Sequence, residues 1–391
     1  MERAANLLAA FLSRDGAGLV IALAVAAAGL AAWHASGGAV AGKAAGGVLM
    51  LAGAVLAAGA LRHLVVVAQV ARRHPPPGRM VDAGGFKVHV FAEGTAAEGR
   101  AAVVWFGGGH ASGLTMLPFH RALKADTRSI LIDRPGTAWS DSGPFPRTTA
   151  GEAEECWRAL DAAGERGPFL FVGHSFGGLL AANMARRRPA QTAGLVLLDA
   201  TPPDTIIFGP RLGVLKVMRR GAWLDGALRL VGVHQGPFER TQRKKAPQVF
   251  EQMKRALGDE AYAAEQALQV RSGVMLATAS IFAELHPLGM AARGWETVVY
   301  EGDLGDMPVW LVAPGDAQDV EQLAEMQGAG QREAERIRRF FARTRERYLT
   351  ISSRAVRVTA PQGTSHNFPY EVPELVIGLV REAVGTVRRA G

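Results

Sequence analysis

The sequence of 391 residues holds a single cysteine, Cys156, and its aromatic content is only 7%. One thiol cannot form a disulfide framework, and it cannot supply the cysteine cluster of a structural zinc site. The aromatic and basic strings of nucleic-acid-binding modules are also lacking, and the basic residues are scattered. The net charge of +8 therefore favours a membrane surface with anionic lipids as the partner, and not nucleic acid.

Charged side chains are missing from two long runs near the N-terminus, residues 16–42 and 44–61. Each run is long enough to cross the roughly 30 Å of hydrocarbon in a bilayer as a helix. We therefore expect two transmembrane helices, at about 16–36 and 44–64, within a membrane anchor of residues 1–71. A cleaved signal peptide and buried soluble helices are the alternatives. The first run is longer than a normal signal core, however, and a second run follows it.

Basic residues flank these two runs unevenly. Arg3 and Arg14 precede the first run, and Lys43 lies between the two runs. The second run is followed by Arg62, Arg72, Arg73 and Arg79. The positive-inside rule then places both ends of the anchor in the cytoplasm, joined by a short external turn. Residues 72–79, "RRHPPPGR", form a stiff basic linker in this interpretation. We expect a multi-pass protein of the cytoplasmic (inner) membrane, with its larger domain on the cytoplasmic side.

Short apolar runs alternate with segments of helical spacing from residue 80 onward. The runs 101–106, "AAVVWF", and 168–174, "PFLFVGH", are continuous, which is typical of strands buried in a parallel sheet. Helical spacing in 155–167 and 176–189 separates such runs. The alternation predicts an α/β domain over 80–391, with a mostly parallel sheet and helices on both faces.

The alternation stops between Thr201 and Met307, where the pattern is mostly helical and partly basic. An insertion of this size between two core strands predicts a helical lid, at about 203–307, over one end of the sheet.

The segment "FLFVGHSFGGLL", residues 169–180, places Ser175 between a buried strand and a helix. A turn this sharp crowds the backbone, and Gly173 and Gly177 relieve that crowding. The hydroxyl would then project above the sheet at a helix N-terminus, where partial positive charge favours a developing anion. We interpret Ser175 as a nucleophile, which needs a base and an orienting acid.

His366 is the best-placed base, because it follows the last expected strand in a Gly/Ser/Thr-rich loop. Asp316 is the first choice for the acid, and Asp319 and Asp199 are alternatives, because all three follow core strands. His174 adjoins the serine, and we expect its side chain to point away from the site. His110, in the glycine loop "FGGGH", is a candidate for substrate contact.

An oxyanion that forms at Ser175 needs two backbone N–H donors. One donor is expected from Phe176, the residue after the nucleophile. The other is expected from the loop after the strand at 101–106, where Gly108 is the first choice and Gly109 the next.

Residues 80–391 resemble the α/β-hydrolase superfamily of esterases, lipases and peptidases. The resemblance rests on "DRPGTAWSD", "GPFLFVGHSFGGLLAANMARRRP", "GLVLLDATPPD" and "SHNFPYEVPELV", which occur in the order nucleophile, acid, histidine. It implies a Ser-His-Asp mechanism with no metal and no organic cofactor. One departure is Phe106, because many members have histidine before the glycine run.

Epoxide hydrolases and haloalkane dehalogenases of this fold have aspartate as the nucleophile at the turn between strand and helix. Serine at this position therefore argues against those two activities. The resemblance implies a membrane-anchored serine hydrolase of a small-molecule or lipid-like ester, with an acyl-enzyme on Ser175 and His366 as base. An acyltransferase, amidase or haloperoxidase-like enzyme would use the same triad. A non-catalytic membrane-bound binding protein is the alternative from another class, and it would be expected to lack a triad member.

Overall fold

The computed structural model describes residues 2–95, 100–109, 111–202, 204, 213–285, 296–315 and 330–387. Within them, eight strands form one sheet in the order β1-β2-β4-β3-β5-β6-β7-β8. The strands are β1 (Arg79–Asp82), β2 (Lys87–Glu93), β3 (Ala102–Phe106), β4 (Ser129–Ile132), β5 (Phe169–His174), β6 (Thr192–Leu198), β7 (Val309–Ala313) and β8 (Ala355–Thr359). From β4 to β8 neighbouring strands are parallel, whereas the pairs β1–β2 and β2–β4 are antiparallel.

The helices occur before, between and after these strands. The α-helices are α1 (Glu2–Leu12), α2 (Ala17–Ala35), α3 (Val40–Arg73), α4 (Leu117–Leu123), α5 (Thr149–Ala162), α6 (Phe176–Arg187), α8 (Gly213–Arg229), α9 (Pro237–Lys245), α10 (Pro247–Leu257), α11 (Asp259–Leu268), α12 (Ser272–Glu284), α15 (Gln331–Thr344), α16 (Phe368–Glu371) and α17 (Pro373–Thr386). Short 3-10 helices are η1 (Gly113–Met116), η2 (Pro189–Gln191) and η3 (Arg345–Leu349). The predicted α/β class with a mostly parallel sheet is confirmed.

The sheet separates two hydrophobic cores. Strand β3, the run "AVVWF", is buried along its whole length because helices cover both of its faces. On one face, α5 and α6 contribute Trp157 and Leu180 to the core. On the other face, α4 and α17 contribute Phe119 and Val380. Since β5 and β6 are parallel neighbours, the residues that follow them meet at the same sheet edge.

Helices α8 to α12 lie between β6 and β7, where the sequence pattern predicts a helical insertion. Two of these helices approach the sheet-bearing part of the protein near the expected site. Helix α10 packs on α4, α16 and η1, and α11 packs on η1. The helical character of the insertion is therefore observed, whereas its action as a lid stays a prediction.

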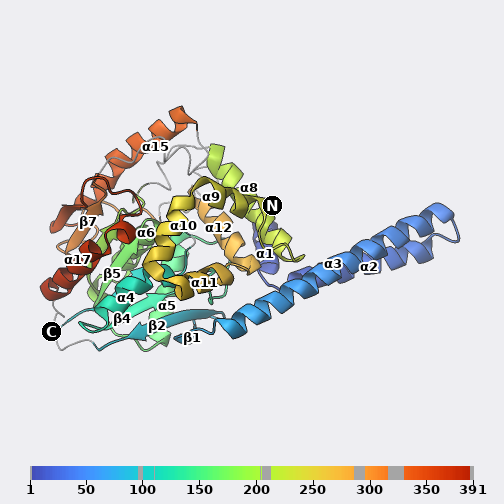
Figure 1. Ribbon diagram of the computed structural model, residues 1–391, viewed down its shortest axis with the longest axis horizontal. Coiled ribbons are helices and arrows are strands. Elements are labelled where there is room, and N and C mark those ends of the chain that lie inside the picture. Colours follow the sequence, from blue (N-terminus) through green and yellow to red (C-terminus); the bar gives the residue numbers. More distant parts are fainter. Residues whose placement is uncertain are drawn as a thin grey trace.

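Helices α2 and α3 form an antiparallel hairpin that projects away from the sheet (Figure 1). Both helices are long and apolar enough to cross a bilayer. Glycines let them approach closely, because a Cβ at Gly46 would lie 2.7 Å from the carbonyl oxygen of Gly29. At the base of the hairpin, a Cβ at Gly18 or Gly59 would collide with backbone at Leu230 or Val231, after α8.

We predict that Gly46→Leu separates the two helices, because the added side chain points into the backbone of α2. The expected loss is about 1–3 kcal/mol, seen as a lower melting temperature in detergent. Gly47→Leu is the matched control, since a Cβ there meets only the Trp33 side chain, at 3.6 Å. Equal melting temperatures for the two variants would contradict the observed helix contact.

Candidate active site

Ser175 lies on a strained turn between β5 and α6. Its φ of 53° and ψ of −121° are uncommon for a residue with a side chain. The flanking glycines make room for this turn. A Cβ at Gly173 would lie 2.3 Å from the carbonyl oxygen of Gly177, and a Cβ at Gly177 would lie 2.6 Å from that of Phe106. The serine therefore stands at the N-terminus of a helix, as the sequence motif predicts.

His366 lies between Ser175 and Asp199, in the loop that connects β8 to α16. Its Nε2 is 3.1 Å from Ser175 Oγ, and its Nδ1 is 2.6 Å from Asp199 Oδ2. The Asp199 side chain is 1% exposed and that of His366 is 25% exposed, so the histidine borders solvent and the carboxylate does not. The three side chains form a continuous hydrogen-bonded row.

Asp199 is the acid candidate that this row contains. It follows the last residue of β6 directly, and its φ is 41°. The first choice, Asp316, and the alternative Asp319 lie outside the described residues, as does His110.

Asp199 is ionised in this setting. Burial alone would raise the pKa of its carboxyl group. The hydrogen bond from His366 and the positive charges of His366 and Arg345 outweigh that effect and hold the pKa below its usual range. A carboxylate in this state can orient the imidazole and stabilise it when it takes up a proton.

Two backbone segments lie beside Ser175. Phe176 begins α6 directly after the serine. A Cβ on Gly108 would lie 3.1 Å from Ser175 Cβ, so the loop after β3 passes beside the nucleophile. The carbonyl of Gly109 accepts a hydrogen bond from Arg134, whose guanidinium lies 5.5 Å from the Phe176 ring. The buried guanidinium of Arg134 thus contacts the loop after β3 and the start of α6, the two segments in which we predict oxyanion donors.

The expectation that the His174 side chain points away from the site is wrong. Its Nε2 lies 2.9 Å from the carbonyl oxygen of His366, and the two rings are 4.8 Å apart. Burial and the charge of His366 lower the pKa of His174 to about 3. A neutral imidazole packed on this loop supports His366 from the side opposite to solvent.

Two polar residues outside the predicted set also hold the histidine loop. Glu371 of α16 accepts hydrogen bonds from the Ser365 amide, at 2.9 Å, and from the Ser365 hydroxyl, at 2.5 Å. Gln252 of α10 donates to the same carboxylate, at 3.1 Å. The helical insertion is therefore linked to the residue before His366. Sequence spacing carries no signal for this contact, because 119 positions separate its partners.

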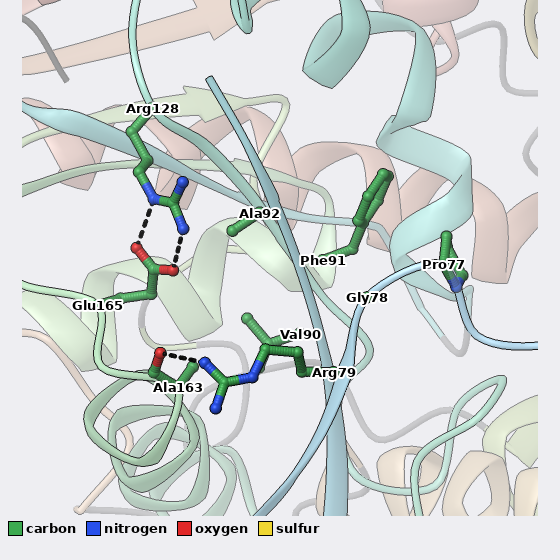
Figure 2. Close-up of a pocket in the computed structure, with 9 residues that line it drawn as sticks. All are labelled: Pro77, Gly78, Arg79, Val90, Phe91, Ala92, Arg128, Ala163 and Glu165. Carbon is green, nitrogen blue, oxygen red and sulfur yellow. Dashed lines mark hydrogen bonds and ion pairs between the residues drawn. The ribbon is translucent and has the colours of Figure 1, made fainter. Parts of the chain in front are cut away.

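A cavity of about 210 Å³ lies away from this site, and Figure 2 shows its lining residues. Arg128 and Glu165, which line it, precede β4 and β5, whereas Ser175 follows β5. Arg128 Nη2 pairs with Glu165 at 2.6 Å, and Arg79 donates to the carbonyl of Ala163 at 3.1 Å. The charged groups of this cavity are thus bonded to the protein itself.

Comparisons with known proteins show the family and the fold. Residues 103–379 match the model of a family described as the alpha/beta hydrolase family. Lipase LipV of Mycobacterium tuberculosis is 58% identical over 53 residues, which are 14% of this chain and 19% of the lipase. The chain spans less than half the length of the curated relatives it matches.

Two solved structures show the same fold. A meta-cleavage product hydrolase from Pseudomonas fluorescens is 17% identical with a TM-score of 0.51, over 79% of this chain and 98% of that one. A "probable hydrolytic enzyme" from Pseudomonas aeruginosa is 15% identical with a TM-score of 0.53, over 76% of this chain and 89% of that one.

We predict that Gly177→Ala destabilises the turn at Ser175, because the new methyl group would press on the carbonyls of residues 106 and 107. The expected cost is about 1–3 kcal/mol, measured by thermal unfolding. Gly378→Ala is the control, because it lies in α17 with nothing within 4 Å of its Cβ. It should be neutral or gain about 0.5–1 kcal/mol. A Gly177→Ala protein as stable as wild type would contradict the close approach.

Proposed function

The chain belongs to the alpha/beta hydrolase family, and on that premise we propose that it is a membrane-anchored serine hydrolase that cleaves a carboxylic ester. One observation carries the proposal: the hydrogen-bonded row from Ser175 Oγ through the His366 imidazole to the buried Asp199 carboxylate. We therefore assign the acid to Asp199 and not to Asp316. A serine hydroxyl is a poor nucleophile unless a base removes its proton, and this row supplies such a base.

In the proposed reaction, His366 Nε2 takes the proton of Ser175 Oγ as that oxygen attacks the ester carbonyl. The N–H groups of Phe176 and Gly108 stabilise the negative oxygen of the tetrahedral intermediate. Collapse of the intermediate breaks the bond to the alcohol, which leaves with the proton held by His366. Water then attacks the acyl-enzyme by the same route and releases the acid.

An ester is the substrate class that we favour, and the short, highly identical match to a protein named a lipase supports it. Ser175, His366 and Asp199 do not by themselves determine which acyl chain of an ester is accepted. We propose a lipid-like ester because the site belongs to a chain with a membrane hairpin.

Membrane anchoring is supported by the length and surface of the α2–α3 hairpin. Residues 19–35 and 40–58 lie beyond its packed base, and helices of 17 and 19 residues span about 26 and 28 Å, close to the hydrocarbon thickness of a bilayer. Large apolar side chains on this part are exposed, for example Leu23 at 60% and Leu51 at 67%. Water would disfavour such a surface, whereas lipid accommodates it. We place the catalytic domain on the cytoplasmic side.

The insertion over about 203–307 is proposed as a lid. Ile281 of α12 packs on Phe176 and Leu179 at the start of α6. Helix α12 therefore covers the segment that carries the nucleophile, and access of a substrate would depend on its position.

The hydrolase mechanism predicts that a fluorophosphonate probe labels the detergent-solubilised full chain. Ser175→Ala and His366→Ala should abolish labelling, the first by removing the nucleophile and the second by removing its base. Asp199→Asn should slow labelling by about 10³–10⁴-fold, because the imidazole loses its orienting charge.

Asp204→Asn is the matched control, since this acid lies on the same loop but contacts Arg347 and not His366. A well-folded wild type that is not labelled would rule out the mechanism. Hydrolysis is distinguished from acyl transfer by the release of free acid from ester substrates without added alcohol.

The proposed topology predicts that Ala39→Cys, in the exposed turn between α2 and α3, reacts with a membrane-impermeant maleimide added to intact cells. Val356→Cys, exposed at the edge strand β8, should react only after lysis. The native Cys156 is buried and gives a low background. Labelling of Val356→Cys in intact cells would reverse the orientation, and release of the chain from membranes by alkaline carbonate would exclude the anchor.

A further inference from the structure

The carboxylate of Asp199 has a second charged partner besides His366. Arg345 Nη2 lies 2.7 Å from Asp199 Oδ1, where it forms an ion pair without hydrogen-bond alignment. The Asp199 side chain is 1% exposed and that of Arg345 is 16% exposed, so solvent screens this pair weakly. Both oxygens of the carboxylate are therefore engaged, one by the histidine and one by the arginine.

Arg345 begins η3, and two further side chains of this short helix hold the loop after β6. Arg347 Nη1 donates to Asp204 Oδ2 at 2.8 Å, and the buried hydroxyl of Tyr348 donates to the carbonyl of Thr201 at 2.7 Å. The Thr201 amide donates in turn to the carbonyl of Ser175 at 2.9 Å. Helix η3 thus fixes the loop that carries the acid, and that loop bonds directly to the nucleophile.

Among the residues that the structure describes, the other ionisable side chains beside His366 do not add a positive charge. Burial and the neighbouring imidazole lower the pKa of His174 to about 3, and burial raises the pKa of Tyr370 to about 12. Both are neutral near pH 7. Glu371 is hydrogen-bonded to the residue before the histidine. The guanidinium of Arg345 stays charged throughout, and it pairs with the Asp199 oxygen that His366 leaves free.

We propose that Arg345 is a positioning residue of the hydrolytic site, which holds the Asp199 carboxylate in the orientation that bonds to His366 Nδ1. The inference rests on the proposed function, because it assigns His366 the role of base. It adds a residue from the segment between β7 and β8 to a site otherwise formed by the loops after β3, β5, β6 and β8.

The test measures the rate of fluorophosphonate labelling of the full chain in detergent at limiting and at saturating probe, which separates probe binding from the chemical step. Arg345→Met is expected to slow the chemical step about tenfold with unchanged probe affinity, because the Asp199 carboxylate loses the partner that fixes its orientation. Arg345→Lys keeps a positive charge and should retain most of the wild-type rate. Arg347→Met is the matched control: it breaks the ion pair with Asp204, and it should lower the melting temperature without slowing the chemical step.

A double-mutant cycle of melting temperatures with Asp199→Asn measures the ion pair independently of activity. Non-additive shifts together with a slower chemical step in Arg345→Met support the inference. A wild type that labels normally and an Arg345→Met protein that labels at the same rate would overturn the inference and leave the proposed function intact. A folded wild type without labelling would remove the proposed function first, and the role assigned to Arg345 with it.

Discussion

The backbone at Ser175 is the constraint from which the site follows, because its positive φ turns the chain from β5 into α6 within one residue. This conformation needs glycine at 173 and 177, where any Cβ would meet backbone atoms. It also needs neighbours that hold it in place. The Ser175 amide donates to the carbonyl of Leu198, and its carbonyl accepts from Thr201, so the end of β6 supports the turn on both sides. Asp199 lies between these two bonds, also at positive φ.

The α2–α3 hairpin, the helical insertion and the candidate site are connected through a few contacts. The base of the hairpin packs on residues 230 and 231 after α8, and His63 of α3 lies 3.1 Å from both Asp15 and His234. From the insertion, Gln252 donates to the Glu371 carboxylate, which holds the loop of His366. If the hairpin anchors the protein as we propose, the anchor and the proposed catalytic domain are joined by packing as well as by the chain.

Much of the fold could be predicted from the sequence, because the signals are local. Continuous apolar runs mark buried strands, and the glycines around Ser175 mark the turn, so the α/β class and the choice of Ser175 and His366 as candidates follow from short segments. The acid was harder, since Asp199 and Asp316 both follow core strands and only the fold decides which one reaches His366. Contacts such as that of Arg345 with Asp199 join residues 146 positions apart. The orientation of His174 also depends on the loop packed against it, and the prediction that its side chain points away from the site was wrong.

The proposed mechanism requires that Ser175 forms an acyl-enzyme. The most direct measurement is mass spectrometry of the full chain quenched shortly after mixing with a p-nitrophenyl ester. We expect a mass increase equal to the acyl group, located on the peptide that contains Ser175 and lost as the ester is consumed. An ester that is hydrolysed with no adduct at Ser175, or with an adduct that persists in Ser175→Ala, would contradict it.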